Sequence, residues 1–404
     1  MHRGAVGAMV CTAAAIAMAP ASAAAAPAAP TCPDLFVLGV QGTSESNPAA
    51  DPLATTGMIG QVFGPLANNR NIGHTTIPYV AAFGGAPGTG LDSTPFATSQ
   101  AQAEQHLDAT ATSKSAQCPS TSLAFVGFSQ GGGVVADYAR KIGAGATSIR
   151  PDRVAGVAAI SDWTRAPGGD RIPGRPGQTT PDPPAGTTGV ATSHVHLPPV
   201  PTSGGIGANT TGFGSLTGHV AEICAAGDLS CDAPPHAELL RAAGGIAAQA
   251  DLHDPVAAAA TLSAGASRAL VSAKASLALN DLHVEGGQVN YVPAEPASQR
   301  LADAADPRHA QPTPDQQRAA DGRIAQAVAA VAADPVRQLP RLGGQIGAAI
   351  GANLAANADL TNPATLAKYG NVVASHTGYG ARGDTQKVSE WVGAMAHDIE
   401  RAKR

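Results

Sequence analysis

The segment GFSQG at residues 127–131 restricts the fold more than any other part of the sequence. It follows the apolar run 123–126 and precedes residues 134–142, whose apolar spacing is helical. A Gly-x-Ser-x-Gly sequence between a strand and a helix is typical of a sharp turn that exposes the serine at the sheet edge. The alternative is an ordinary glycine-rich turn, because such a short motif also arises by chance in a chain with 47 glycines. The context favours Ser129 as a nucleophile.

Further apolar runs predict the remainder of a buried sheet. Residues 35–40 and 154–160 are short, apolar and ended by Gly or Ser, which is typical of strands covered on both faces, and residues 219–224 are a fourth candidate. Helical patterns such as residues 101–112 lie between these runs. Strands that alternate with helices predict an α/β fold with a parallel sheet and helices on both of its faces.

The second half of the chain has a different character. Residues 167–214 are rich in Pro, Gly and Thr and predict a long loop. Residues 237–361 are Ala-rich and helical, and Thr313-Pro-Asp-Gln316 has the form of a capped helix start. We interpret 237–361 as a helical insertion and a possible cap. It would lie between the first part of the α/β core, 32–236, and its completion in 362–404, where strand-helix character is expected to return near Val372.

The N-terminus predicts export. A basic start at Met1-His2-Arg3, an apolar run over 5–19 and Ala-Ser-Ala at 21–23 together form a secretory signal peptide over residues 1–23. The apolar run is too short for a membrane span. Cys11 would suit a lipoprotein anchor, but too little apolar sequence precedes it, so we interpret it as removed with the signal. The mature protein is then secreted or associated with the cell envelope.

Composition argues against several classes of partner. The formal charge is −5 and charged residues make up 14%, without a basic stripe, so we expect no nucleic-acid partner. The spacing of the cysteines, without a nearby histidine pair, argues against a zinc site, and we expect neither a metal nor a cofactor.

Four cysteines remain after signal removal, and an oxidising compartment would pair them. Four cysteines allow three pairings. The short loop CAAGDLSC, residues 224–231, favours a local bridge between Cys224 and Cys231, which leaves Cys32 with Cys118.

The same loop contains the best candidate for a catalytic carboxylate. Serine becomes a nucleophile when a histidine takes its proton, and a carboxylate fixes the tautomer of that histidine. In this architecture the chain order is Ser, then Asp or Glu, then His. Asp228 follows Ser129 and lies just beyond the fourth predicted strand. A disulfide around it would hold the carboxylate in place, although Gly227-Asp228 alone also suits an ordinary turn.

Together these motifs resemble the cutinase family of α/β-hydrolases. The similar segments are GFSQGG around Ser129, CAAGDLSC around Asp228 and VQGTSESN at 40–47, and the cysteine pairs match the family's two disulfides. The chain is most similar to actinobacterial cutinase-like enzymes of the mycolic-acid envelope, which act as lipases, phospholipases and thioesterases. The resemblance covers about 31–235 and resumes near 372. It implies a three-layer sandwich around a parallel sheet, with the helical insertion before the catalytic histidine.

The resemblance also implies roles for further residues. By position, the backbone N–H groups of Thr43 and Gln130 would form the oxyanion hole, although the family often has Ser where Thr43 stands. SHTGYG at 375–380 is similar to the family's His-x-x-Tyr segment before a final helix, here expected over 385–403, and it indicates His376 as the base. Compact members have the histidine soon after the aspartate, which keeps His236 and His253 as alternatives.

We therefore expect an exported serine esterase that acts on lipid or polyester acyl bonds as a monomer, in contact with a membrane or cell-envelope surface. Ser129 attacks, His376 shuttles the proton, Asp228 orients it and water resolves the acyl-enzyme. An acyltransferase would use the same residues with a sugar hydroxyl in place of water. A protein that keeps the fold but only binds the envelope is the alternative from another class.

The helical insertion contains a glycine stripe at residues 343, 347 and 351, beside apolar residues at 346, 350 and 354. Glycine destabilises a helix interior, so a smooth face of this kind predicts a close neighbour or lipid. We expect close packing within a small helical subdomain, with a cap over the active site as the alternative.

Overall fold

The computed structural model describes Met1 and residues 32–404, so the predicted signal peptide, apart from Met1, lies outside the described residues. The chain divides into Met1–Cys32 and Pro33–Arg404, and every described helix and strand belongs to the second unit.

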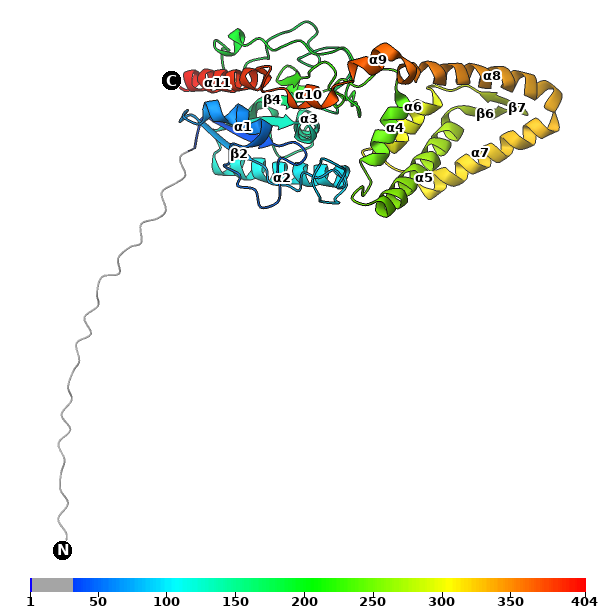
Figure 1. The fold of residues 1–404 in the computed structure, drawn as a ribbon, viewed down its shortest axis with the longest axis horizontal. Coiled ribbons are helices and arrows are strands. Elements are labelled where there is room, and N and C mark those ends of the chain that lie inside the picture. The colour runs from blue at the N-terminus through cyan, green and yellow to red at the C-terminus, as the bar shows by residue number, and fades with distance from the viewer. Residues whose placement is uncertain (2–31) are drawn as a thin grey trace. The chain divides into compact units, whose positions relative to one another are not determined.

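A five-stranded parallel sheet forms the centre of the α/β core (Figure 1). Its strand order is β2-β1-β3-β4-β5, and every neighbouring pair is parallel. The strands are β1 Leu35–Val40, β2 Ile72–Thr76, β3 Ser122–Phe128, β4 Val154–Ile160 and β5 Val220–Ile223. The four predicted strands are confirmed. The parallel pairing places the carboxyl ends of β3, β4 and β5 at one sheet edge, which is where ligand sites form in open α/β sheets.

Helices cover both faces of the sheet and complete three layers. On one face α1, Gly57–Phe63, and α11, Asp384–Lys403, bury side chains such as Phe63 and Trp391 against the sheet. On the other face α2, Phe96–Gln117, and α3, Gln130–Gly143, bury Leu107 and Val135. Successive strand residues point to opposite faces, so Val37 joins the first cluster and Leu38 the second. The predicted α/β fold is confirmed.

The Ala-rich region is helical, with one hairpin that the sequence analysis missed. Its elements are α4 Glu238–Ala247, α5 Pro255–Asn280, β6 Leu282–Glu285, β7 Gln288–Tyr291, α6 Ala297–Ala305, α7 Pro314–Ala333 and α8 Pro335–Ala355. The predicted capped start is confirmed, since Thr313 Oγ1 accepts from the Gln316 N–H and the Gln316 side chain accepts from the Thr313 N–H. The boundaries 237 and 361 remain predictions.

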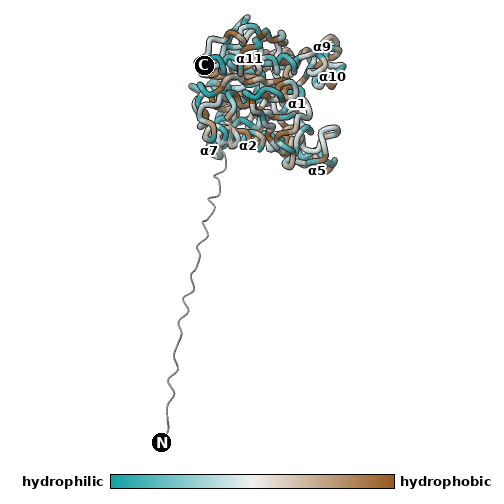
Figure 2. Tube along the Cα trace, turned by 90° about the vertical axis from the view of Figure 1, so that its left-hand side faces the viewer, coloured by the Kyte–Doolittle hydropathy of each residue, from teal (hydrophilic) through white to brown (hydrophobic). Residues whose placement is uncertain are grey.

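Small residues pack these helices together. Helix α5 is the one described helix that is long and apolar enough to cross a membrane by length and composition. Figure 2 colours its trace, with the rest of the chain, by the hydropathy of each residue. Ala269 of α5 packs in a cluster with Ala242 and Ala305, and Ala275 packs in a cluster with Ala320, so α5 contacts its neighbours α4, α6 and α7.

The two ends of the insertion meet, and its first helices bind loops of the α/β core. The His236 N–H donates to Asp359 Oδ2 at 2.9 Å, and the Asp359 N–H donates to the His236 carbonyl at 3.1 Å. The Leu252 N–H donates to the Gly84 carbonyl at 2.6 Å. Further along, Arg308 donates to the Gly207 carbonyl at 2.6 Å. The insertion is therefore attached to the core at several points.

The return to the core differs from the expectation near Val372. Two short helices, α9 Pro363–Lys368 and α10 Val372–Thr377, follow α8, and no strand follows β7 in the described chain. Asn362 caps α9 through its side chain, which accepts from the Ala364 N–H, and this local capping favours helix over strand. The final helix α11 begins at Asp384, one residue from the expected start.

Candidate active site

Ser129 lies at a strained turn between β3 and α3. Its φ is +56° and its ψ is −115°, a conformation that L-residues rarely adopt. The turn needs its glycines: a Cβ on Gly127 would lie 2.0 Å from the Gly131 carbonyl oxygen, and a Cβ on Gly131 would lie 2.1 Å from that of Val40. The Ser129 N–H donates to the Ile160 carbonyl at 2.9 Å. Ser129 is half-buried at the carboxyl edge of the sheet, as the motif predicts.

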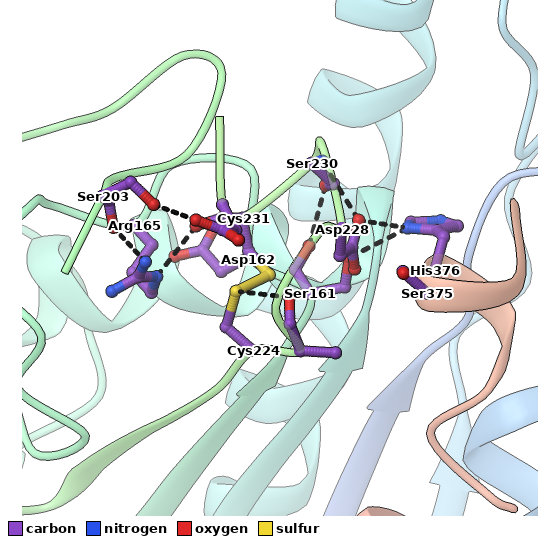
Figure 3. The surroundings of a disulfide bond; sticks show 12 residues. Ser161, Asp162, Arg165, Ser203, Cys224, Asp228, Ser230, Cys231, Ser375 and His376 are labelled. Carbon is purple, nitrogen blue, oxygen red and sulfur yellow. Dashed lines mark hydrogen bonds and ion pairs between the residues drawn. A yellow bond between two sulfur atoms is a disulfide. The ribbon is translucent and has the colours of Figure 1, made fainter. Parts of the chain in front are cut away.

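Asp228 is fully buried in the loop that the Cys224–Cys231 disulfide closes. Its Oδ1 lies 2.9 Å from His376 Nδ1 and accepts from the Ser230 N–H at 3.0 Å. Its Oδ2 accepts from two hydroxyls, those of Ser161 and Tyr379, each at 2.6 Å. Figure 3 shows this carboxylate beside the disulfide, with Ser161 and His376 directed at it.

These partners keep Asp228 ionised. Burial alone would raise the pKa of its carboxyl. The hydrogen bond and charge of His376, together with the hydroxyls of Ser161 and Tyr379, outweigh burial and hold the pKa below its ordinary value. A buried carboxylate that stays charged can fix a histidine tautomer and stabilise its protonated form.

His376 on α10 is the histidine that the structure brings to Asp228. With Nδ1 directed at the carboxylate, Nε2 is the ring nitrogen left to face a substrate. The ring centroid lies 5.2 Å from that of Phe128, the residue before Ser129, so the imidazole lies beside the serine turn. The two alternative histidines face other carboxylates: His236 Nδ1 lies 3.5 Å from Asp359 Oδ2, and His253 Nδ1 lies 3.1 Å from Asp254 Oδ2.

Ser161 is a site residue that sequence reasoning missed. It follows β4 directly and is fully buried, with φ +56°. Besides its bond to Asp228, its Oγ lies 3.1 Å from His376 Nδ1, so one hydroxyl contacts both groups. A serine directly after a buried strand, at the edge where Ser129 is expected, was the available signal.

Tyr379 is the tyrosine of the His-x-x-Tyr segment. It is fully buried, and burial together with the adjacent Asp228 raises its pKa well above the ordinary value. The hydroxyl therefore stays protonated and donates to Asp228, while its oxygen accepts from the Ala225 N–H at 3.1 Å. Tyr379 thus connects the segment of His376 to the disulfide loop.

Thr43 and Gln130 lie side by side, as their expected role requires. Thr43 Oγ1 donates to Gln130 Oε1 at 3.4 Å, and Gln130 Nε2 donates to the Phe96 carbonyl at 3.1 Å. Gln130 is the first residue of α3, where a backbone N–H has no acceptor within the helix. Gly42 lets this loop approach Ser129, because a Cβ there would lie 3.3 Å from Ser129 Cβ and 2.8 Å from Phe128 Cδ1.

The half-buried carboxylate of Glu45 holds the Thr43 loop in place. The two oxygens of Glu45 accept from the Gly42 N–H at 3.1 Å and from the Met58 N–H at 3.0 Å. Burial raises the pKa of Glu45, and these two backbone bonds partly oppose the rise. The Gly42 N–H is therefore committed to Glu45, and it is not available to a substrate oxygen.

The other expected features are placed as follows. Cys32 and Cys118 are both disulfide-bonded, as are Cys224 and Cys231. Within residues that the structure describes, no three His, Cys, Asp or Glu side chains cluster in a way that could hold a metal ion.

Comparison with known proteins gives a family and one related sequence. The family model described as Cutinase matches residues 31–239. A carboxylesterase Culp6 homologue of Corynebacterium glutamicum is 32% identical over 211 residues, which is 50% of this chain and 66% of that protein, just under two thirds of its length.

Solved structures give weaker likenesses. The catalytic core domain of acetyl xylan esterase from Trichoderma reesei is 18% identical with a TM-score of 0.35, covering 58% of this chain and 98% of that one. Lysin B from Mycobacteriophage D29 is 16% identical with a TM-score of 0.32, and the match covers 55% of this chain and 75% of that one.

Proposed function

Because the chain belongs to the cutinase family, we propose that it is an exported serine esterase that hydrolyses carboxylic esters of lipids or polyesters. The observation that carries the proposal is the contact between His376 Nδ1 and the buried Asp228, on a ring that lies beside the Ser129 turn. The carboxylesterase name of the Corynebacterium relative supports the same reaction class.

In the proposed mechanism, Ser129 Oγ attacks the ester carbonyl carbon while His376 Nε2 takes the hydroxyl proton. Asp228 stabilises the imidazolium that forms. The backbone N–H groups of Thr43 and Gln130 donate to the oxyanion of the tetrahedral intermediate. The intermediate collapses, the C–O bond breaks, and the leaving alcohol takes the proton from His376. Water then repeats the sequence on the acyl-enzyme and releases the acid.

Ser161 and Tyr379 act in this scheme as positioning residues. Their hydroxyls both donate to Asp228 Oδ2, which orients the carboxylate so that Oδ1 faces the histidine. Charge-assisted hydrogen bonds of this kind are about twice as strong as neutral ones. The carboxylate therefore stays fixed although the histidine is carried by a six-residue helix with no buried residue.

Export is part of the proposal and has separate support. Disulfides persist in oxidising compartments outside the cytosol, and four cysteines of this chain are disulfide-bonded. The contact between His376 and the buried Asp228, on a ring that lies beside the Ser129 turn, favours catalysis over an envelope-binding protein without activity. Acyl transfer to a sugar hydroxyl would use the same first half-reaction.

The test is hydrolysis of soluble p-nitrophenyl esters by the purified mature protein and two variants. Ser129→Ala should lower the rate more than about a hundredfold, in line with typical losses on removing a nucleophile. Ser193→Ala, a change at an exposed serine outside the site, should leave the rate unchanged. A Ser129→Ala protein that keeps more than about a hundredth of the rate would contradict the proposal.

A further inference from the structure

Helix α8, Pro335–Ala355, directs its amide side chains inward. The buried Gln338 accepts from the Val289 N–H at 3.1 Å, and Gln345 accepts from the Tyr291 N–H at 2.9 Å. Asn353, in the last turn of the helix, accepts from the Ser298 N–H at 2.8 Å. Amide side chains therefore attach α8 to the β6–β7 hairpin and to α6. This is the reverse of an ordinary surface helix, which buries its apolar stripe.

The apolar side chains of α8 point to solvent. Five aliphatic side chains form this surface, which we name the α8 apolar face, and their exposed fractions are 83% for Val336, 57% for Leu339, 48% for Ile346, 57% for Ile350 and 70% for Leu354. Their spacing of three, seven, four and four residues keeps them on one side of a helix.

The glycines of α8 are open as well, and this corrects an expectation. A Cβ built on Gly343, Gly347 or Gly351 would meet no atom within 4 Å beyond the helix itself. The close packing that the glycine stripe predicted is therefore not found. Glycine with nothing against it leaves a smooth surface, and the stripe lies on a part of α8 that no described residue of the chain covers.

Exposed apolar residues continue from α8 toward the candidate active site. Leu366 of α9 is 57% exposed and Val373 of α10 is 74% exposed. Val373 lies three residues before His376, and Figure 1 shows the chain passing from α8 through α9 to α10. A body that covered the α8 apolar face and these two residues would lie next to the segment that carries the proposed base.

Charge and area restrict what this body can be. Residues 342–358 contain no Asp, Glu, Lys or Arg, so this stretch offers no ion pair to a charged partner. A single apolar stripe along one helix exposes a surface area on the order of a few hundred Å². A stable contact between two protein copies takes about 800 Å² from each. A lipid surface needs neither charge nor shape complementarity, because burial of apolar side chains among acyl chains is sufficient.

We propose that the α8 apolar face, with Leu366 and Val373, docks on the surface of an aggregated zwitterionic or neutral acyl lipid. Docking requires no catalysis. That the docked lipid also supplies the ester substrate rests on the proposed function, and it would bring acyl chains to the side of the molecule where α10 holds His376.

Binding is tested in the Ser129→Ala background, so that hydrolysis plays no part. The measurement is co-flotation with phosphatidylcholine vesicles of the parent and of a triple variant, Ile346→Ser, Ile350→Ser and Leu354→Ser. The matched control is Val256→Ser with Leu270→Ser, two exposed aliphatic residues of α5. Circular dichroism and thermal unfolding check that each variant is folded.

We expect the partition coefficient of the triple variant for vesicles to be at least tenfold lower than that of the parent, while the control variant binds like the parent. Added salt should change binding little, because Ile346, Ile350 and Leu354 lie in the stretch 342–358, which contains no charged residue. Equal binding by parent and triple variant would overturn the proposal, as would an equal loss in the control. A dimer in gel filtration that the triple variant dissociates would identify a second copy as the occupant and also overturn it.

A kinetic measurement separates this proposal from the proposed function. In the active protein, the triple variant should hydrolyse a soluble short-chain ester at the parent rate and an emulsified long-chain ester more slowly. Equal loss on both substrates would contradict lipid docking. Absence of esterase activity in the parent would contradict the proposed function but would leave the vesicle result standing.

Discussion

Replacement of Ser161 by Ala and by Gly separates catalysis from stability at one position. Both changes remove the hydroxyl that donates to Asp228 Oδ2 at 2.6 Å in a fully buried site. A hydrogen bond to a charged group contributes about 1.5–3 kcal/mol, and both variants lose it. They differ in the backbone, because φ at Ser161 is +56°. The left-handed region disfavours alanine by roughly 1–2 kcal/mol, and glycine adopts it freely.

The two variants should therefore have the same kcat and different stabilities. We expect kcat to fall about tenfold in each, which corresponds to about 1.4 kcal/mol of transition-state stabilisation, with KM unchanged because Ser161 does not touch substrate. The Gly variant should be more stable than the Ala variant by about 1 kcal/mol. Urea unfolding gives the stabilities, and hydrolysis of a soluble ester gives kcat and KM.

The reasoning fails if kcat follows stability. A Gly variant with parent activity and an Ala variant with reduced activity would mean that Ser161 only accommodates the turn after β4. A change in KM with unchanged kcat would also refute a positioning role, because it would place Ser161 in contact with substrate.

Three further predictions concern other parts of the fold. His376→Ala should be as inactive as a protein without its nucleophile and His236→Ala should hydrolyse ester at the parent rate, since residues of one triad act as a unit; the reverse ranking would assign the base to His236. Glu222→Gln should stabilise the protein increasingly as pH rises above 4.5. Burial and the neighbouring carboxyl of Asp162 raise the pKa of Glu222 well above that value, so the folded state must hold a proton that the unfolded chain releases. An equal stability difference between variant and parent at pH 5 and pH 8 in urea unfolding would contradict this prediction. Replacing Cys224 and Cys231 by Ser should lower stability by about 2–3 kcal/mol, the value for so short a loop, yet lower kcat at least tenfold at a temperature where the variant is folded; full activity would show that Asp228 does not need the bridge.

The parts of the fold that could be predicted are those with a dense local signal. The strands at 35–40 and 154–160 match the observed bounds because both faces are buried and the apolar runs are continuous. Strand β2, Ile72–Thr76, was missed because it lies at the sheet edge and contains one apolar side chain, that of Ile72, so it has no apolar run. The β6–β7 hairpin had a signal in the Gly286-Gly287 turn between two short alternating segments, which the helical interpretation of the region obscured.

The residues of the candidate site likewise fall into those with a local sequence signal and those that only the fold brings together. Ser129 and Asp228 lie in short motifs whose local structure is fixed by glycines and by a disulfide, so their neighbourhoods could be read from the sequence. His376 was indicated only by the similarity of SHTGYG to a family segment, because its contact with Asp228 depends on how the chain returns after the whole insertion. Ser161 belongs to no motif, and only the adjacent ends of β3, β4 and β5 bring its hydroxyl to the carboxylate.

The central claim is that Ser129 is a nucleophile activated by His376, and labelling with a fluorophosphonate tests it most directly. The serine oxygen displaces fluoride from phosphorus, so the label marks an activated serine without any choice of substrate. We predict one label per molecule of mature protein, mapped by peptide mass spectrometry to the peptide that contains Ser129, and strongly slowed labelling in His376→Ala. Absence of label on a folded protein, or a label on another serine, would contradict the account.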